Sequence, residues 1–528
     1  MDHANNEAVS TSVDEAPAAT PSRLPAGPAA LIGVLALAAA LTVGHLAAAF
    51  LGFGASPYLA VGNAAVDLAP SWLKDFAISA FGTMDKPVLL AGMAVVMVLL
   101  AAVAGLISRR RPLPGQWFIA VFGVLGIVAV YTRPNLGQLS VIAPVLSLLT
   151  GVIVFRVLHN AALNALLDAP FEEGPRSVGR RRILFTGVAV GAFLTGGLGQ
   201  WLGSRRDAEG SRAAVGPLVP AEPAPPSPAD ADFAKLGTPT FLTANADFYR
   251  IDTALVVPQV RAEDWSLRIH GMVEKEITYT YADIRNRPLV ERVVTLCCVS
   301  NPVGGPYIST AKFLGVDLAG LLDEAGVRPG AQQLYSTSVD GFTAGTPIST
   351  VLDPGRGAML AIGMNGEPLP VEHGFPARLV VPGLYGYVSA TKWVTDLEVT
   401  TWDARQAYWI QRGWAQQAPI KTESRIDAPQ GAVPAGKVRL AGIAWAQHTG
   451  IAKVEVQLDN GPWQQAMLSA DVTEDAWRMW WAEFDAAPGG HKASVRATDR
   501  SGYTQTDQVA DVVPDGATGW HTITFTAR

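Results

Sequence analysis

The stretch Thr295-Leu-Cys-Cys-Val-Ser-Asn-Pro-Val-Gly-Gly305 holds both cysteines of this 528-residue chain. Adjacent cysteines rarely bridge each other, because a disulfide needs Cα atoms further apart than neighbouring residues comfortably allow. Two cysteines also cannot supply a disulfide framework or a four-thiolate metal site. The residues alone leave three interpretations open: a buried structural pair, a reactive thiol, or one thiolate that binds a group held by the rest of the chain.

The composition is too apolar for an ordinary soluble enzyme, with 49% hydrophobic and 16% charged residues. The apolar excess lies before residue 204. About 20 apolar residues suffice for a helix to cross a bilayer. Five segments are therefore expected to be membrane-spanning helices: 29–52, 88–108, 116–131, 138–157 and 183–203. The net charge of −6 and the lack of a basic stripe give no reason to expect nucleic acid.

The loops between these segments predict their orientation. With a cytoplasmic N-terminus, the inner side holds nine arginines and the outer loops hold three cationic residues, as the positive-inside rule requires. We therefore expect a multi-pass protein of the cell membrane with residues after 204 outside the cytoplasm. Arg180, Arg181 and Arg182 resemble an internal twin-arginine export signal, although a plain cytoplasmic cluster explains them equally well.

The segments on either side of the helical anchor (29–204) have a different amino-acid composition. Residues 1–28 are expected to be a disordered tail, and the Pro- and Ala-rich segment 205–237 a semi-extended spacer. His45 and His159 in the anchor are too few and too scattered to predict a haem pair. We interpret both as packing or interfacial residues and expect no haem.

The outer part divides into two predicted domains. Residues 238–428 mix strands such as "WSLRIHGMV" (265–273) with helical runs such as "GVDLAGLLDEAGV" (315–327), which favours an α+β fold over a doubly wound sheet. Residues 429–528 alternate apolar and polar residues, with the turn Asp459-Asn460-Gly461 between two strands. This pattern predicts an immunoglobulin-like β-sandwich.

Six ordered motifs of the outer part resemble the sulfite oxidase family. They are "DFYRI" (247–251), "TLCCVSN" (295–301), "ISTAKFLGVDLAGLL" (308–322), "SVDGFTAGTPI" (338–348), "EHGFPARLVVPGLYGYVSATKW" (372–393) and "YWIQRGW" (408–414). The resemblance implies a molybdopterin-binding domain and, in the C-terminal region, that family's dimerisation domain, hence a possible homodimer. The family's cysteine stands three residues before an Asn, as Cys298 does before Asn301, so the resemblance implies Cys298 as metal ligand and Cys297 as strand packing.

The resemblance also implies roles for other residues. One protein thiolate suffices for the molybdenum because the pterin brings two further sulfurs. Arg250, Asp340 and Phe342 match positions that line the family's substrate pocket. Positions that contact the pterin or its phosphate are matched by Tyr249, Arg250, His373, Arg378, Ser389, Thr391 and Lys392.

Two functions of different classes follow from the resemblance. The first is a membrane-anchored molybdenum oxidoreductase that transfers an oxygen atom to or from a small molecule and exchanges electrons with an unidentified partner. Sulfoxide or N-oxide reduction is expected rather than sulfite oxidation, because Pro302 and Val303 stand where sulfite oxidisers carry arginines and Phe342 where they carry a tyrosine. The second is an inactive receptor or scaffold that keeps the fold.

Overall fold

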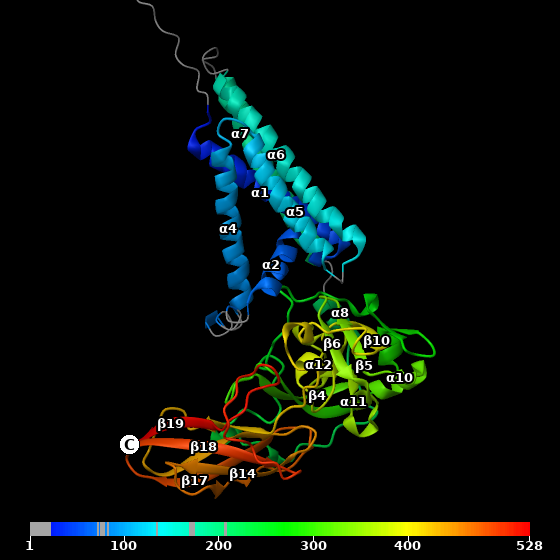
Figure 1. Ribbon diagram of the computed structural model, residues 1–528, viewed down its shortest axis with the longest axis vertical. Coiled ribbons are helices and arrows are strands. Elements are labelled where there is room, and N and C mark those ends of the chain that lie inside the picture. The colour runs from blue at the N-terminus through cyan, green and yellow to red at the C-terminus, as the bar shows by residue number, and fades with distance from the viewer. Residues whose placement is uncertain are drawn as a thin grey trace, which may run out of the picture. The chain divides into compact units, whose positions relative to one another are not determined.

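The computed structural model describes residues 23–70, 73, 76, 80–81, 84–133, 136–167, 175–204 and 208–528 (Figure 1). The chain divides into two compact units, residues 1–205 and 206–528, and each is described by itself. Most of the expected disordered tail lies outside the described residues. Its last three residues, 26–28, already belong to the first helix.

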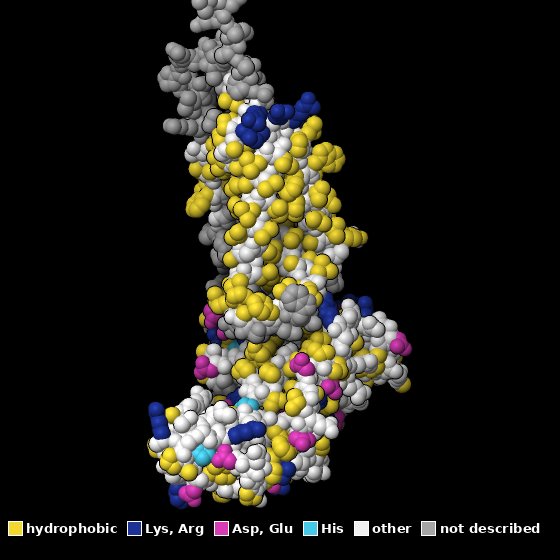
Figure 2. Space-filling model, turned by 60° about the vertical axis from the view of Figure 1, so that its left-hand side comes forward, with side chains coloured by type: hydrophobic (Ala, Val, Ile, Leu, Met, Phe, Trp, Pro, Cys, Tyr) yellow, Lys and Arg dark blue, Asp and Glu magenta, His cyan; other side chains and the backbone are white. Residues whose placement is uncertain are grey.

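The first unit is built of helices. They are α1 (Ala26–Leu51), α2 (Pro57–Leu68), α4 (Asp85–Ile107), α5 (Leu113–Tyr131), α6 (Ile142–Leu167) and α7 (Pro175–Ser204). Among the described residues, four helices are long and apolar enough to cross a membrane: Ala26–Leu51, Lys86–Ile107, Leu113–Tyr131 and Gln138–Asn164. The fifth expected span lies in α7, but its apolar part, Phe185–Gly199, is shorter. Hydrophobic side chains cover the outside of the helices (Figure 2).

Small residues allow α1 and α4 to pack closely. A Cβ atom added to Gly33 of α1 would clash with the carbonyl group of Ala101 on α4. One added to Gly105 would clash with the carbonyl group of Ala29. Such small-residue contacts let backbones approach where no hydrophobic effect drives helices together.

The two histidines of the helical unit take part in helix packing. The Nε2 atom of His159 lies 2.6 Å from the carbonyl oxygen of Ser108, and its ring stacks on that of Phe155. The ring of His45 on α1 lies against the backbone of Gly199 on α7. These contacts agree with the packing interpretation of both residues.

The segment expected to be a spacer instead packs on the second unit. It contains α8 (Ala208–Val215), where Arg212 donates hydrogen bonds to the carbonyl oxygens of Pro368 (3.1 Å) and Leu369 (3.0 Å). Further along, the backbone N–H of Ala221 bonds to the carbonyl oxygen of Leu289 beside a sheet edge, at 2.8 Å. The spacer interpretation was wrong because alanine and proline are small enough to be buried, and extended backbone can pair with an edge strand.

Two mostly antiparallel sheets form the first part of the second unit. One sheet has the order β3-β4-β7-β8, with β9 paired to β7, and the other has the order β2-β1-β10-β5-β6. The first contains β3 (Val290–Cys297), β4 (Ile308–Asp317), β7 (Met359–Met364), β8 (Glu367–Pro368) and β9 (Arg378–Val380). The second contains β1 (Ser266–Gly271), β2 (Ile277–Thr280), β5 (Gln333–Ser338), β6 (Thr343–Pro347) and β10 (Val394–Thr400). Within these two sheets, only β1 and β10 pair in parallel, which agrees with the expectation against a doubly wound sheet.

Short helices connect these strands: α9 (Tyr281–Arg285), α10 (Leu318–Ala325), α11 (Ile348–Leu352) and α12 (Gly386–Ser389). The expected amphipathic helix is α10. The Asp317 side chain caps its start by accepting a hydrogen bond from the backbone N–H of Gly320, and Gly326 ends it with φ +70°.

Two further sheets, of four and five strands, form the C-terminal part (Figure 1). The first contains β11 (Glu423–Ala428), β13 (Gly436–Trp445), β16 (Met467–Leu468) and β17 (Arg478–Ala486). The second contains β12 (Ala432–Val433), β14 (Ile451–Leu458), β15 (Gln464–Gln465), β18 (Gly489–Asp499) and β19 (His521–Ala527). Residues from both sheets share one hydrophobic core. The predicted turn is present, with positive φ at Asp459 and Asn460.

Trp480 and Trp481 provide a test of this core. Trp480 is fully buried and its Nε1–H donates to the carbonyl oxygen of Ile443 at 3.2 Å, whereas Trp481 is half-buried. We expect Trp480→Ala to lower the free energy of unfolding by about 3–5 kcal/mol, because it leaves a cavity and an unpaired carbonyl group. Trp481→Ala should lower the free energy of unfolding by a clearly smaller amount. Thermal unfolding followed by near-ultraviolet circular dichroism would compare them, and equal losses would contradict this description of the core.

The C-terminal part also holds the end of β3 in place. The backbone N–H and carbonyl groups of Thr295 bond to Asp475 (2.9 Å) and to the side chain of Gln447 (2.9 Å). The Thr295 hydroxyl accepts a hydrogen bond from the backbone N–H of Trp477 at 2.7 Å. These bonds fix the strand that leads directly to the two cysteines.

Candidate active site

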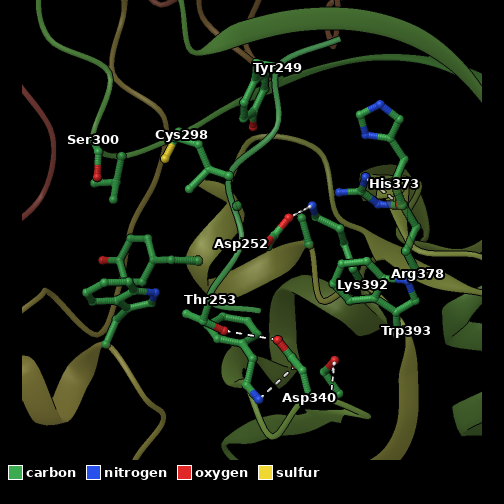
Figure 3. A pocket seen from close by; sticks show the side chains of 18 of the residues that line it. Tyr249, Asp252, Thr253, Cys298, Ser300, Asp340, His373, Arg378, Lys392 and Trp393 are labelled. Atoms are coloured by element: carbon green, nitrogen blue, oxygen red, sulfur yellow. Dashed lines mark hydrogen bonds and ion pairs between the residues drawn. The ribbon is translucent and has the colours of Figure 1, made fainter. Parts of the chain in front are cut away.

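A pocket opens beyond the end of β3, and it collects residues from motifs far apart in the sequence (Figure 3). It encloses about 890 Å³ of space, its open mouth included. The lining residues are Phe248, Tyr249, Ile251, Asp252, Thr253, Cys298, Val299, Ser300, Ser338, Asp340, Phe342, His373, Arg378, Gly386, Tyr387, Ala390, Lys392, Trp393, Trp409 and Trp414.

The end of β3 separates the two cysteines. Cys297 is the last residue of the strand, is only 1% exposed and belongs to the hydrophobic core. Cys298 follows the strand, is partly exposed and faces the pocket. Burial raises the pKa of the Cys298 thiol, while hydrogen bonding by Ser300 and the charge of Lys392 act in the opposite sense. The two neighbours therefore have different environments, and only Cys298 is available to a ligand.

Arg378 is a buried cation at the other end of the pocket (Figure 3). Its side chain is 4% exposed, and it forms no ion pair with a carboxylate in the described part of the chain. One guanidinium N–H donates to the carbonyl oxygen of His373 at 3.2 Å. Burial lowers the pKa of Arg378 to about 10, so it stays charged at neutral pH. A buried charge without a partner is costly, which favours an anionic ligand here.

Lys392 lies beside Arg378 and is paired with Asp252. The Lys392 ammonium is 3.0 Å from a carboxylate oxygen of Asp252 and also donates to the carbonyl oxygen of Glu372 at 3.1 Å. Burial lowers the pKa of Lys392 to about 8, and the charge of Asp252 opposes that shift. Lys392 is thus held toward the pocket in its charged form at pH 7.

Arg250 lies outside the pocket, contrary to the expectation that it lines it. It pairs with the same oxygen of Asp252 at 3.0 Å, and its side chain is 38% exposed. Tyr249 lines the pocket instead.

The other aromatic and imidazole groups expected at the site are in the pocket. His373 bonds through Nε2 to the carbonyl oxygen of Asn245 at 3.0 Å, and burial lowers its pKa to about 4. It is therefore a neutral group that donates one hydrogen bond. Burial raises the pKa of Tyr249 well above its ordinary value, so its hydroxyl stays protonated. Both rings pack against Phe248.

Asp340 and Phe342 also line the pocket, as expected. One carboxylate oxygen of Asp340 accepts a hydrogen bond from the hydroxyl of Thr253, and the other from the backbone N–H of Phe342, both at 3.2 Å. Figure 3 shows Thr253 and Asp340 joined in this way. The loop that follows β5 therefore presents a fixed carboxylate to the cavity.

Ser389 and Thr391 are not among the lining residues. Both side chains are fully buried. The Ser389 hydroxyl donates to backbone carbonyl groups of its own turn at 3.0 and 3.1 Å, and the Thr391 hydroxyl bonds to that of Ser336 at 2.7 Å. Their hydroxyls stabilise the protein interior, so the structure does not bring them to the pocket with Lys392.

Several lining residues were not anticipated one by one. They are Phe248, Ile251, Asp252, Thr253, Val299, Ser300, Ser338, Gly386, Tyr387, Ala390, Trp393, Trp409 and Trp414. Most of them lie inside the motifs quoted above, which was the available signal. Asp252 and Thr253 lie just past the "DFYRI" motif, where nothing in the sequence marked them.

The residues present fit a molybdopterin cofactor. One end of the pocket offers a thiol, and the other offers an unpaired buried guanidinium and an ammonium group, which match a phosphate. In the described part of the chain, no group of three His, Cys, Asp or Glu side chains could hold a metal ion. A metal beside Cys298 would therefore take its other ligands from the cofactor.

Comparison with known proteins agrees with this fit. Residues 254–409 match the model of the oxidoreductase molybdopterin-binding domain. The chain is 29% identical over 329 residues to sulfite oxidase of Gallus gallus, covering 53% of this chain and 71% of the relative. It is 28% identical over 333 residues to mitochondrial sulfite oxidase of Macaca fascicularis, covering 53% and 60%.

The chain is also similar to two proteins that are not named sulfite oxidases. The chain is 35% identical over 192 residues to the NADPH nitrate reductase of Emericella nidulans, covering 32% of this chain and 22% of that enzyme. The solved structure of the sulfane dehydrogenase SoxCD from Paracoccus pantotrophus aligns at 25% identity and a TM-score of 0.47, covering 53% of this chain and 80% of that one. The chain spans about 60% of the length of several sulfite oxidases that it matches. The chain therefore contains an oxidoreductase molybdopterin-binding domain, and over about half its length it is similar to sulfite oxidases.

Proposed function

We propose that the chain is a membrane-anchored oxidoreductase whose extracytoplasmic domain transfers an oxygen atom, most readily in the reduction of sulfoxides or N-oxides. One observation carries the catalytic part: Cys298 and the unpaired cation of Arg378 face the same pocket. A scaffold without catalysis would gain nothing from a buried charge that lacks a partner. The purified full chain should contain about one molybdenum per molecule.

Different side chains of the pocket would bind different parts of the cofactor. Arg378 and Lys392 would bind the phosphate, and Cys298 would bind the metal. Tyr249 would donate a hydrogen bond to a polar group of the pterin, and His373 would accept one through Nδ1, because its Nε2–H bonds to Asn245. When bound, the molybdenum cofactor supplies the two-electron chemistry of oxygen-atom transfer. The Thr295 bonds described above hold the Cys298 thiolate in a fixed position, which limits the reorganisation needed at each turnover.

The charges of the helical unit support the proposed membrane orientation. The backbone N–H of Leu24 bonds to the carbonyl oxygen of Arg109 at 2.8 Å, which brings Arg23 to the same end as Arg109, Arg110 and Arg111. Figure 2 shows Lys and Arg side chains gathered at one end of the helices. That end is the proposed cytoplasmic side. The side chains of Arg180–Arg182 lie outside the described ones, and the export signal remains a hypothesis.

The polar groups near Cys298 favour a substrate that is not an anion. A small dianion in a partly desolvated pocket needs charge-assisted donors. Arg250 lies outside the pocket, and His448 pairs with Asp475 at 2.9 Å and does not line it. The cations that do line it, Arg378 and Lys392, are those assigned to the cofactor phosphate. A sulfoxide or N-oxide carries no net negative charge, so its binding requires no cationic side chain beside Cys298.

We expect the detergent-solubilised, molybdenum-loaded chain to reduce at least one sulfoxide or N-oxide with a kcat/KM well above its kcat/KM for sulfite oxidation. The reason is the lack of an arginine beside Cys298 in the pocket lining. Steady-state assays with an artificial electron donor for reduction and an artificial acceptor for sulfite would measure both. A kcat/KM for sulfite of about 10⁴ M⁻¹s⁻¹ or more, above that for every sulfoxide and N-oxide, would refute the substrate assignment.

Further partners are part of the same proposal. Reduction of a sulfoxide consumes two electrons and two protons and releases water, so an electron donor must reach the domain. We further propose that the C-terminal sheets are of immunoglobulin type and support a homodimer, as the family resemblance implies.

A further inference from the structure

Asp340 presents a carboxylate to the pocket without a cationic partner. Its two oxygens accept hydrogen bonds only from neutral groups, the Thr253 hydroxyl and the Phe342 backbone N–H, each at 3.2 Å. No Lys, Arg or His within the described ranges forms an ion pair with it. The remaining acidic residue of the pocket, Asp252, is neutralised by Lys392 and Arg250. Asp340 is thus an uncompensated negative charge in the lining.

An aromatic wall continues from Asp340 along the pocket. The Phe342 ring lies 6.0 Å from the ring of Tyr408, and Tyr408 lies 5.1 Å from Trp409. Trp414 then contacts both Trp409, at 6.0 Å between ring centres, and Tyr387, at 5.8 Å. Of these rings, Phe342, Trp409, Trp414 and Tyr387 line the cavity itself.

The lining therefore carries charges of both signs. The Arg378 and Lys392 cations match a phosphate (Figure 3). Asp340 is a separate carboxylate in the same lining, which also holds aromatic rings, and such a combination attracts cations, above all weakly hydrated alkylammonium groups.

We propose that this enzyme selects substrates that carry a positive charge, with Asp340 and the aromatic wall of Phe342, Trp409, Trp414 and Tyr387 as the specificity-determining groups. The inference rests on the proposed reduction of sulfoxides or N-oxides. It narrows the substrates to those sulfoxides and N-oxides that carry an alkylammonium group. The charge lies on a part of the substrate that does not react, so its binding to Asp340 orients the oxygen-bearing atom.

The test uses three aryl methyl sulfoxides that differ only in the para substituent: trimethylammonium, the isosteric neutral tert-butyl, and carboxylate. In the full-length, molybdenum-loaded enzyme, the ratio of kcat/KM for the ammonium compound to that for the tert-butyl compound is measured in the wild type and in Asp340→Asn. Comparing ratios cancels the intrinsic reactivity of each sulfoxide. We expect the ratio to fall about tenfold in the variant, as the loss of one charge contact in a partly solvated pocket predicts. Asp340→Glu should keep most of the ratio.

A binding measurement gives a second readout that does not depend on turnover. Isothermal titration of the loaded protein with phenyltrimethylammonium, which has no oxygen to transfer, should give a Kd about tenfold weaker for Asp340→Asn than for the wild type. Asp507→Asn is the matched control, because Asp507 is exposed and outside the pocket lining. Its Kd should equal that of the wild type.

The outcomes separate the two proposals. If the wild type reduces no sulfoxide or N-oxide but binds phenyltrimethylammonium through Asp340, the proposed function fails and the cation site stands. If Asp340→Asn changes neither the ratio of kcat/KM values nor the Kd for phenyltrimethylammonium, the proposed cation site is wrong. If Asp340→Asn fails to load cofactor, the Kd for phenyltrimethylammonium is compared between Trp409→Leu and Trp409→Phe. Only the leucine variant loses an aromatic ring, so only that variant should bind the ammonium compound more weakly.

Discussion

Cys298→Ser should abolish oxygen-atom transfer, with a loss of about 10³-fold or more in kcat, equivalent to about 4 kcal/mol of transition-state stabilisation. A serine hydroxyl has a far higher pKa than a thiol and is a hard ligand. It is therefore a poor substitute at a metal that must cycle between oxidation states. The measurement is steady-state reduction of the best sulfoxide, together with molybdenum content. The variant should still contain pterin, because Arg378 and Lys392 are intact.

Cys297→Ser is the matched control one residue away. Its thiol is in the core and 1% exposed, and its Sγ atom lies 3.6 Å from the carbonyl oxygen of Cys298. We expect activity within about threefold of the wild type and a loss of about 1–2 kcal/mol in stability from the buried hydroxyl. Reversed phenotypes would show that the ligand is Cys297. Unchanged activity in both variants would contradict the proposed enzyme.

The sequence predicted the site best where a motif and a local backbone rule agreed. Cys298 was assigned through the family resemblance, and the end of β3 at Cys297 explains in physical terms why only the next residue faces the pocket. His373, Arg378 and Lys392 came from one motif and do meet in one cavity. The roles of all of them remain predictions until the variants are measured.

The prediction failed where a side chain's place depends on its contacts in the folded chain. Arg250 pairs with Asp252 and is not among the residues that line the cavity. Thr391 bonds to Ser336 of β5, a contact that no local pattern could have indicated. The spacer prediction failed for the same reason, since Arg212 has three of its hydrogen-bond partners more than 150 residues further along the chain.

Arg378→Met should prevent cofactor loading and at the same time stabilise the empty protein. In the folded chain the guanidinium is buried without an anion, and burial lowers its pKa to about 10. A cation whose folded pKa is depressed destabilises the fold at every pH below that pKa, here by about 3 kcal/mol at neutral pH. Methionine fills a similar volume without the charge, so the apoprotein variant should melt at a higher temperature than the wild-type apoprotein.

The loaded state should reverse this order, because Arg378 is proposed to bind the cofactor phosphate, which would neutralise the buried charge. Molybdenum content of Arg378→Met should fall at least about tenfold, since one charge-assisted bidentate contact is lost. Arg439→Met is the control, because Arg439 is 57% exposed and pairs with Glu483 in the C-terminal sheets. Apoprotein from a host unable to make molybdopterin and loaded protein from a normal host would be compared by metal analysis and thermal unfolding. An Arg378→Met apoprotein that melts lower than the wild type, or a variant that loads normally, would show that the buried cation serves the fold and not the cofactor.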